Sequence, residues 1–157
     1  MTANPYAGFL YDDDVLGILT ATPARLRKNS GAISGTQVST PLAPGKWSVQ
    51  QVLVHLADCE IAFGFRLRQA QAGVSIQPFD QDAWAESSSR YSVAQALETF
   101  SVMRAWNLAF VKGLSEAEKQ RIVTHPERGQ MTLWTIVETM AGHDLNHLTR
   151  LDSLRNG

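Results

Sequence analysis

The sequence predicts an all-α protein, a four-helix bundle whose helices are joined by long loops. Four segments have helical character: three carry apolar residues on one side, at three- and four-residue steps in the last, and the second is apolar nearly all round. A serine followed three residues later by glutamine or glutamate, a capping-box pattern, precedes three helical stretches. Four principal helices with long connections favour a bundle around one core. At 157 residues the chain has the size of a single domain, residues 1–157.

The first helix is predicted from residue 9 to about residue 21. Three aspartates at positions 12–14 fall in its first turn, where carboxylates stabilise the positive end of the helix dipole. Thr22 and Pro23 interrupt the pattern, because proline is tolerated at the first position of a helix but not within one. Two interpretations remain: a second short helix capped by Thr22 and running to about residue 29, or a single kinked helix.

The second helix is predicted over residues 49–72, after a loop at residues 31–45 that is rich in Gly, Ser, Thr and Pro. Ser48 and Gln51 form its capping box, and Gly73 ends it. The segment is apolar nearly all round, which is typical of a helix buried on most sides in the middle of a bundle. His55 lies within it.

The second half of the chain contains two more principal helices. A long connection at residues 73–91 contains Pro78, Phe79 and Trp84, and loops of this length often line a site. The third helix is predicted from Ser92 to just before Gly113.

A short helix follows from Ser115 to about residue 121. Residues 122–130 form either a turn or a small extended pair. The last helix is predicted over residues 132–154, with apolar residues that bracket two histidines.

Those histidines, His143 and His147, are four residues apart and therefore lie on one helix face, roughly 6 Å apart at Cβ. Such a pair can reach one divalent ion, although the spacing also occurs by chance. Taken alone, His55 fits a buried neutral imidazole hydrogen-bonded to a carbonyl better than it fits a metal ligand. Because all three occupy interior positions of the two most apolar helices, we expect His55, His143 and His147 to bind a single metal ion. His125, beside a proline in a loop, is expected at most at the rim.

Three neutral imidazoles leave a fourth position open, which is typical of catalytic rather than structural sites. Imidazole binds several divalent metals, so the ligands do not select one. Carboxylates should orient the rings. Asp58 follows His55 by three residues and Asp144 adjoins His143, so these two are the candidates. The alternative for both is a solvated carboxylate.

Two arginines are candidates for binding an anionic part of a substrate. Arg66 lies eleven residues, about three helical turns, beyond His55, and Arg150 lies three residues beyond His147. Surface positions are the alternative for both. Cys59, four residues after His55, could approach the metal, but a small buried core residue is the competing interpretation.

The composition excludes several classes of protein. The net charge of −1 gives no indication of a nucleic-acid partner or a membrane surface. The chain has no apolar run that approaches the ~18–20 residues of a membrane span. A single cysteine rules out an internal disulfide and fits a reducing compartment, so a cytoplasmic protein is expected.

Three passages resemble the DinB-like, or YfiT-like, superfamily of bacterial metalloenzymes. Residues 44–58, PGKWSVQQVLVHLAD, are similar to the family's W-S-x-x-x-x-x-x-H-L segment. Residues 78–80 with Trp84 resemble its loop after the second helix. Residues 142–148, GHDLNHL, followed by Arg150, resemble its closing H-D-x-x-H helix. The resemblance extends from about residue 15 to residue 154.

The resemblance implies an up-down-down-up bundle, a nickel or zinc ion on His55, His143 and His147, and a homodimer. It also implies a small-molecule substrate, because characterised relatives include transferases that use low-molecular-weight thiols and a thiol-dependent isomerase. The expected function is therefore metal-dependent transfer of a small thiol to an electrophile. Two alternatives remain: a metal-dependent hydrolase with Asp58 or Asp144 as the base, and a non-catalytic metal- or ligand-binding stress protein.

Overall fold

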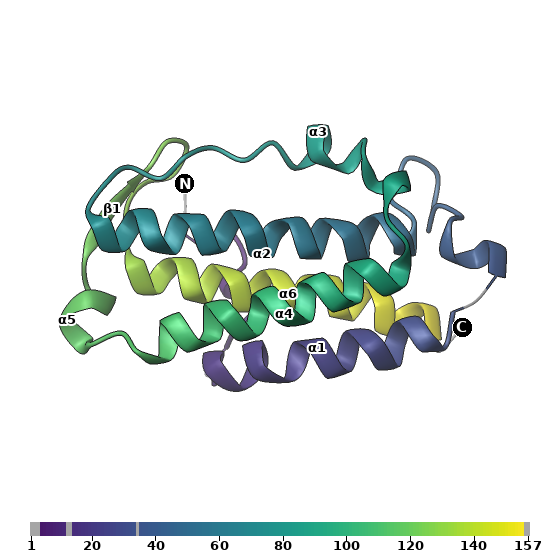
Figure 1. The fold of residues 1–157 in the computed structure, drawn as a ribbon, viewed down its shortest axis with the longest axis horizontal. Coiled ribbons are helices and arrows are strands. Elements are labelled where there is room, and N and C mark those ends of the chain that lie inside the picture. The colour runs from purple at the N-terminus through teal and green to yellow at the C-terminus, as the bar shows by residue number, and fades with distance from the viewer. Residues whose placement is uncertain (1–3, 12–13, 34, 156–157) are drawn as a thin grey trace.

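The structure is a computed structural model that describes residues 4–11, 14–33 and 35–155. Within these residues four long helices form the bundle (Figure 1): α1 (Val15–Gly31), α2 (Val49–Ala72), α4 (Val93–Lys112) and α6 (Leu133–Arg155). Shorter elements precede or connect them: η1 (Ala7–Phe9), η2 (Gly35–Val38), α3 (Gln81–Ala85), η3 (Ser88–Arg90), α5 (Glu116–Lys119), β1 (Ile122–His125) and β2 (Gly129–Thr132).

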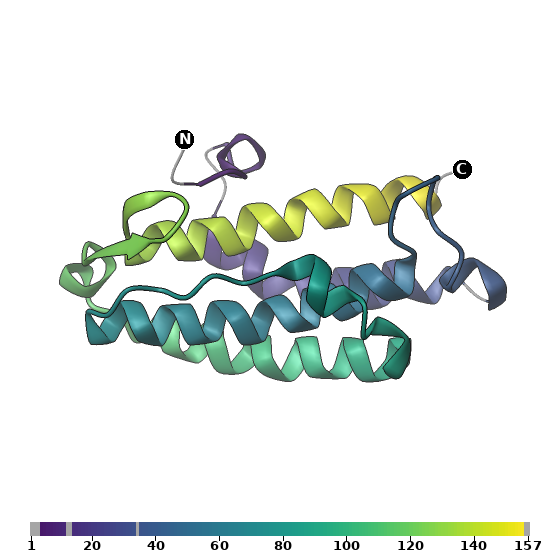
Figure 2. The ribbon, with the colours of Figure 1, turned by 90° about the horizontal axis from the view of Figure 1, so that it is seen from above.

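The bundle has the up-down-down-up topology. Helices α1 and α6 run in one direction along the bundle, and α2 and α4 run in the other (Figures 1 and 2). Helix α2 packs against α4 and α6, and α1 packs against the same two helices. The parallel arrangement of α2 and α4 requires the chain to return along the full bundle, which explains the long connection at residues 73–92. The predicted fold class is confirmed.

Local capping chemistry sets most of the helix ends. The three predicted capping boxes are present, with Ser48, Ser92 and Ser115 each accepting from the backbone three residues on. Gly73 ends α2 with a φ of 72°, a left-handed conformation that glycine adopts at little cost. Residues 122–132 form the extended pair, an antiparallel hairpin of β1 and β2.

The predicted start of the first helix at residue 9 is wrong. Residues 7–9 form a separate 3-10 turn, and α1 begins at Val15 with Asp14 as its cap, accepting from the Leu16 backbone N–H at 3.1 Å. The aspartates at 12 and 13 lie outside the described residues. Of the two interpretations of Pro23, the single helix is correct.

The tertiary structure explains how α1 accommodates this proline. Pro23 has no N–H to donate to the carbonyl of Leu19, one turn back. That carbonyl accepts instead from Arg104 Nη1 of α4, at 3.0 Å. A contact from a distant helix therefore replaces the lost backbone hydrogen bond.

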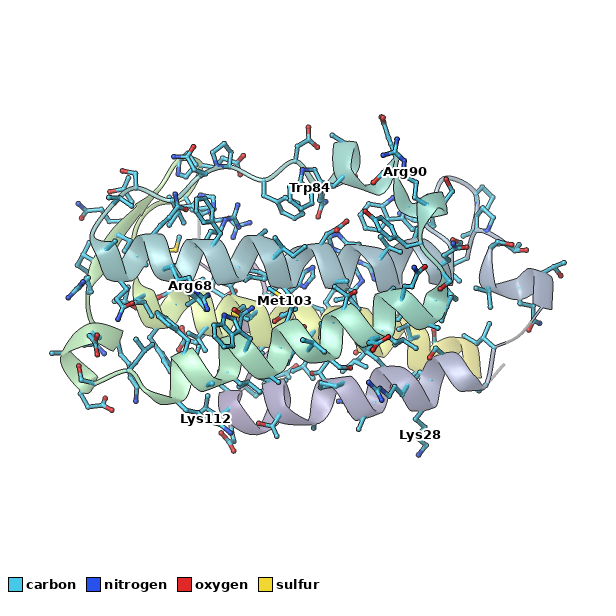
Figure 3. The ribbon with its side chains drawn as sticks, viewed as in Figure 1. Lys28, Arg68, Trp84, Arg90, Met103 and Lys112 are labelled. Carbon is cyan, nitrogen blue, oxygen red and sulfur yellow. The ribbon has the colours of Figure 1, made fainter. Side chains whose placement is uncertain are left out.

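The hydrophobic core is divided into two clusters along the bundle. One cluster contains the second half of α2 and the first half of α6, including Phe63 and Met140. The other contains the first half of α2 and the end of α6, including Leu56 and Leu148. The three histidines lie where the two clusters meet. Surface charges such as Lys28 and Lys112 point outward (Figure 3). No described helix is long and apolar enough to cross a membrane.

Candidate metal centre

The three candidate histidines converge inside the bundle. His55 comes from α2, and His143 and His147 come from the antiparallel helix α6. They are buried, with 2%, 4% and 5% of their surface exposed. His143 Nε2 lies 3.0 Å from His55 Nε2 and 3.2 Å from His147 Nε2. The expected meeting of the three rings is therefore present, whereas their role as metal ligands stays a prediction.

The two short contacts of His143 Nε2 fit metal coordination better than they fit hydrogen bonding. Tetrahedral bonds of about 2.1 Å would separate two imidazole nitrogens by roughly 3.4 Å. His143 Nε2 has two nitrogen neighbours close to that separation. A neutral ring nitrogen either donates one proton or accepts at one lone pair. His143 Nε2 can therefore form a well-directed hydrogen bond with one of its two nitrogen neighbours but not with both. A shared cation would satisfy both.

All three imidazoles are neutral at physiological pH. Burial lowers the pKa of His55 to about 4. Burial, His55 and Arg150 lower the pKa of His147 to about 3. The pKa of His143 is well below its usual value because of burial, the other two histidines, Arg104 and Arg150. Neutral imidazole is the form that binds metal.

These pKa shifts predict that the metal-free protein becomes less stable in mild acid. The unfolded chain takes up protons below a histidine pKa of about 6.5, whereas the folded state does not until about pH 4 or below. The contribution of the neutral rings to the free energy of unfolding is therefore fully present above about pH 6.5. Below that pH it falls by about 1.4 kcal/mol per pH unit for each histidine. Urea unfolding of chelator-treated protein between pH 7.5 and 5 measures it. Equal stability across that range would contradict the buried neutral rings.

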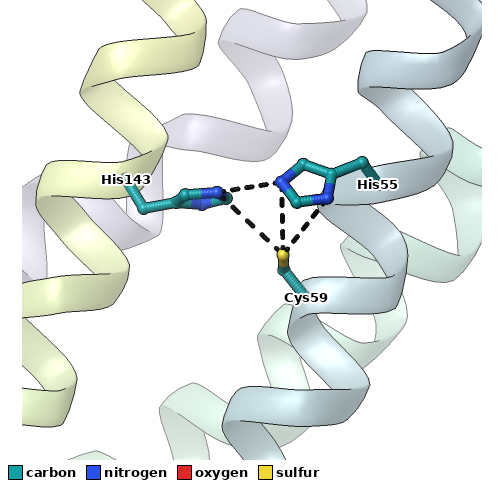
Figure 4. Close-up of side chains that lie close together, drawn as sticks. All are labelled: His55, Cys59 and His143. Carbon is teal, nitrogen blue, oxygen red and sulfur yellow. Dashed lines mark hydrogen bonds between the residues drawn. The ribbon is translucent and has the colours of Figure 1, made fainter. Parts of the chain in front are cut away.

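Cys59 lies against the histidines, one turn after His55 on α2 (Figure 4). Its Sγ is 3.4 Å from His55 Nε2 and 4.0 Å from His143 Nε2. Cys59 is buried, and burial together with Glu60 and Asp144 raises the pKa of its thiol well above the usual value. The sequence left two interpretations of this residue, and the structure places it at the site.

A buried charge network lies beside the candidate ligands. Arg104 of α4, 1% exposed, donates to both carboxylate oxygens of Asp144 at 2.6 and 3.1 Å and to Glu60 at 2.7 Å. Asn107 donates to the second oxygen of Glu60 at 3.0 Å. Glu60 adjoins Cys59 and Asp144 adjoins His143, so the network joins the two ligand-bearing helices to α4.

Sequence reasoning missed Glu60, Arg104 and Asn107. The sequence feature that could have identified them is a charged or amide side chain at a helical position that faces the core. Arg104 follows the buried Phe100 by four residues, and Glu60 precedes the buried Phe63 by three. A charge within an apolar stripe indicates a buried partner, because an unpaired charge in the core is very costly.

The predicted role of the two aspartates is not what the structure shows. Both oxygens of Asp144 accept from Arg104, and no hydrogen bond joins either carboxylate to a histidine ring among the described residues. Asp58 lines a separate hollow between α2 and α4, beside Tyr91. Asp58 and Cys59 lie on opposite flanks of His55. One helical turn is 3.6 residues, so Asp58, three residues on, falls short of a full turn, and Cys59, four residues on, goes past it. The Cys59 flank faces α6.

Two cavities border the histidines from opposite sides. A cavity of about 550 Å³ is lined by Cys59, His143 and Arg66. A second, of about 650 Å³, is lined by His55, His147 and Arg150. The two arginines proposed for substrate binding therefore lie near the site but in different cavities.

His125, expected at the rim, and two aromatic residues line the cavity walls. His125 on β1, together with Phe79, lines the cavity on the Arg66 side. Its Nδ1 accepts from the Glu127 backbone N–H, and its buried Nε2 has no hydrogen-bond partner within the part of the chain that the structure describes. Trp47 lines the other cavity, and Trp84 packs edge-on against Phe79.

Tyr6 of the N-terminal segment lies between the two cavities and lines both. Its ring contacts His143 edge-on, with centroids 5.3 Å apart. Gly142 permits this approach, because a Cβ there would lie 2.6 Å from Tyr6 Cβ and 2.7 Å from the Tyr6 carbonyl oxygen. The lack of a side chain at position 142 thus allows the N-terminal segment to pack closely against the site.

Gly142→Ala is expected to displace residues 4–11 from α6. The added methyl group meets backbone atoms of Tyr6, so the segment must move. Amide hydrogen exchange of residues 4–11 should accelerate, while exchange in α6 stays unchanged. Gly113→Ala is the matched control, because its nearest contacts are an ordinary 3.5 and 3.6 Å. Unaltered exchange in Gly142→Ala would contradict the close packing.

Comparison with known proteins identifies the family. The model of the DinB superfamily matches residues 18–150. A relative from Oceanobacillus iheyensis is 25% identical, covering 96% of this chain and 94% of the relative. YfiT of Bacillus subtilis is 25% identical, covering 90% and 83%. A Bacillus cereus relative is 30% identical, covering 85% and 79%. The names of all three describe candidate metal-dependent hydrolases.

Solved structures share the fold. The structure of YfiT from Bacillus subtilis, described as a four-helix bundle of unusual topology, matches with a TM-score of 0.84 at 24% identity, covering 90% of this chain and 84% of YfiT. A mycothiol-dependent maleylpyruvate isomerase matches with a TM-score of 0.69 at 14% identity, covering 87% and 59%. These likenesses concern the fold alone. The family model, which matches residues 18–150, shows that the chain belongs to the DinB superfamily.

Proposed function

We propose that the protein is a metal-dependent enzyme in which His55, His143 and His147 hold one divalent ion, nickel or zinc. The observation that carries this proposal is the convergence of three buried, neutral imidazoles between two cavities. The names of the relatives, which describe metal-dependent proteins, support it. A site reached from two sides suits a reaction between two molecules.

The reaction that we infer is transfer of a low-molecular-weight thiol to an electrophile. A divalent ion held by the histidines would lower the pKa of a bound thiol and so supply a thiolate at neutral pH. Such a reaction needs no carboxylate base at the rings. Asp144 binds Arg104, and Asp58 lines a separate hollow. The shared fold with a mycothiol-dependent enzyme is compatible with a thiol cosubstrate.

Hydrolysis is the second candidate, favoured by the names of the relatives. It requires a group that accepts a proton from water. The carboxylates of Asp80 and Glu127 line the Arg66 cavity and could serve, although both side chains are exposed. A non-catalytic metal-binding protein is the third candidate.

The chain's own residues would bind and orient the two reactants. Arg66 and Arg150, one in each cavity, would attract carboxylate or other anionic groups. Phe79 and Trp47 would provide apolar walls, one in each cavity. The homodimer and the cytoplasmic setting stay predictions.

The test is incubation of zinc- or nickel-loaded protein with an electrophile and bacillithiol, mycothiol or glutathione. We expect a thioether adduct, detected by mass spectrometry, that disappears after chelation and in His147→Ala. Esters and amides, assayed in parallel, test the hydrolase. Hydrolysis without adduct formation would replace the first proposal by the second, and metal retention without any turnover would favour the third.

A further inference from the structure

The two helices at the site each present a pair of side chains one turn apart. Helix α6 contributes His143 and His147, and α2 contributes His55 and Cys59. Because the helices are antiparallel, Cys59 and His143 border one cavity while His55 and His147 border the other. Cys59 Sγ lies 3.4 Å from His55 Nε2, and His147 Nε2 lies 3.2 Å from His143 Nε2, so the sulfur borders the histidine cluster on one side.

The distances on the sulfur side of the cluster suit coordination. The ligand atoms of His55, Cys59 and His143 all lie within 4.8 Å of one another. His55 Nε2 lies 3.0 Å from His143 Nε2, and Cys59 Sγ lies 3.4 and 4.0 Å from these two atoms. A point about 2.1 Å from all three atoms exists, which is close to zinc–nitrogen and zinc–sulfur bond lengths of roughly 2.1 and 2.3 Å.

A simple hydrogen bond accounts for these contacts less well. Sγ is nearly as close to His55 Nδ1, at 3.7 Å, as it is to Nε2, at 3.4 Å. An atom almost equidistant from both ring nitrogens does not lie along the lone pair of either one. The thiol also carries one proton, which cannot serve the rings of both His55 and His143.

We propose that the Cys59 thiolate is a fourth protein ligand of the divalent ion when no substrate is bound. The proposal rests on the three-histidine site proposed above and adds to it. On coordination the S–H bond breaks, its proton passes to solvent, and a bond forms between Sγ and the ion. Four protein ligands leave no free tetrahedral position, so an outside thiol must compete with Cys59 for the ion. A sulfur ligand also favours zinc over harder ions.

Cobalt substitution tests this directly, because Cys59 is the only cysteine in the chain. In thiol-free buffer, cobalt-loaded wild-type protein should show a sulfur-to-cobalt charge-transfer band in the near ultraviolet. Cys59→Ser, which preserves the size of the side chain, should bind cobalt but lack the band. Cys59→Ala should behave in the same way, and circular dichroism checks that both variants are folded.

X-ray absorption of the zinc-loaded protein gives an independent measurement. We expect one sulfur at about 2.3 Å in the wild type and none in Cys59→Ser. Stoichiometric cobalt without the band, together with a zinc shell of nitrogen and oxygen only, would overturn the fourth ligand and leave the three-histidine site intact. Failure of the folded wild type to bind either ion would overturn the three-histidine site, and this proposal with it.

Discussion

The His143→Ala variant is expected to lose its divalent ion. His143 is the central member of the cluster, since its Nε2 contacts the Nε2 atoms of both His55 and His147. Removing a group that only orients a ligand costs about 10–100-fold in metal affinity, so removing a ligand should cost more than about 100-fold. Competition with a chromophoric zinc chelator measures the affinity, and elemental analysis after dialysis gives the stoichiometry.

His125→Ala is the matched control for this loss. His125 is also a buried histidine and lines the same cavity as His143, but it lies on the β1 strand, and among the described residues its ring hydrogen-bonds only to the Glu127 backbone. It should retain one ion per chain with little change in affinity. Wild-type affinity in His143→Ala, or an equal loss in the two variants, would contradict a site centred on His143.

Arg104→Met is expected to give the largest loss of stability. Methionine replaces the aliphatic part of the arginine side chain but not its charge. The carboxylates of Glu60 and Asp144 are therefore left buried without their cation. Breaking a buried ion pair by removing one partner costs about 3–5 kcal/mol. It also leaves the Leu19 carbonyl, already deprived of a donor by Pro23, without its hydrogen bond. The urea midpoint at pH 7 should fall accordingly.

Arg25→Met is the control, because it removes the same kind of side chain from a surface ion pair. Arg25 and Asp152 remain 45% and 35% exposed, and such pairs contribute about 0–1 kcal/mol. If Arg104→Met cost no more than Arg25→Met, the buried network would not be a main support of the bundle. Weakened metal binding in Arg104→Met would further show that the network positions the ligand-bearing helices.

Helix identity and most helix ends could be predicted because they depend on residues close in sequence. Ser48 caps α2 through Gln51, and Gly73 ends it. The start of α1 was mispredicted because Asp14 caps the helix, so the apolar residues before it belong to a separate turn. Periodicity alone does not distinguish a helix from a turn that packs on the same core.

The sequence by itself determined the helical bundle, the family and the three histidines, because spacing along a helix places His143 and His147 on one face. Only the tertiary structure decided that His55 meets them, because that depends on how α2 packs against α6. It also decided that Cys59 rather than Asp58 faces the site, and that Asp144 binds Arg104 instead of a histidine. A helical repeat fixes angles within one helix, whereas neighbouring helices determine which flank is buried.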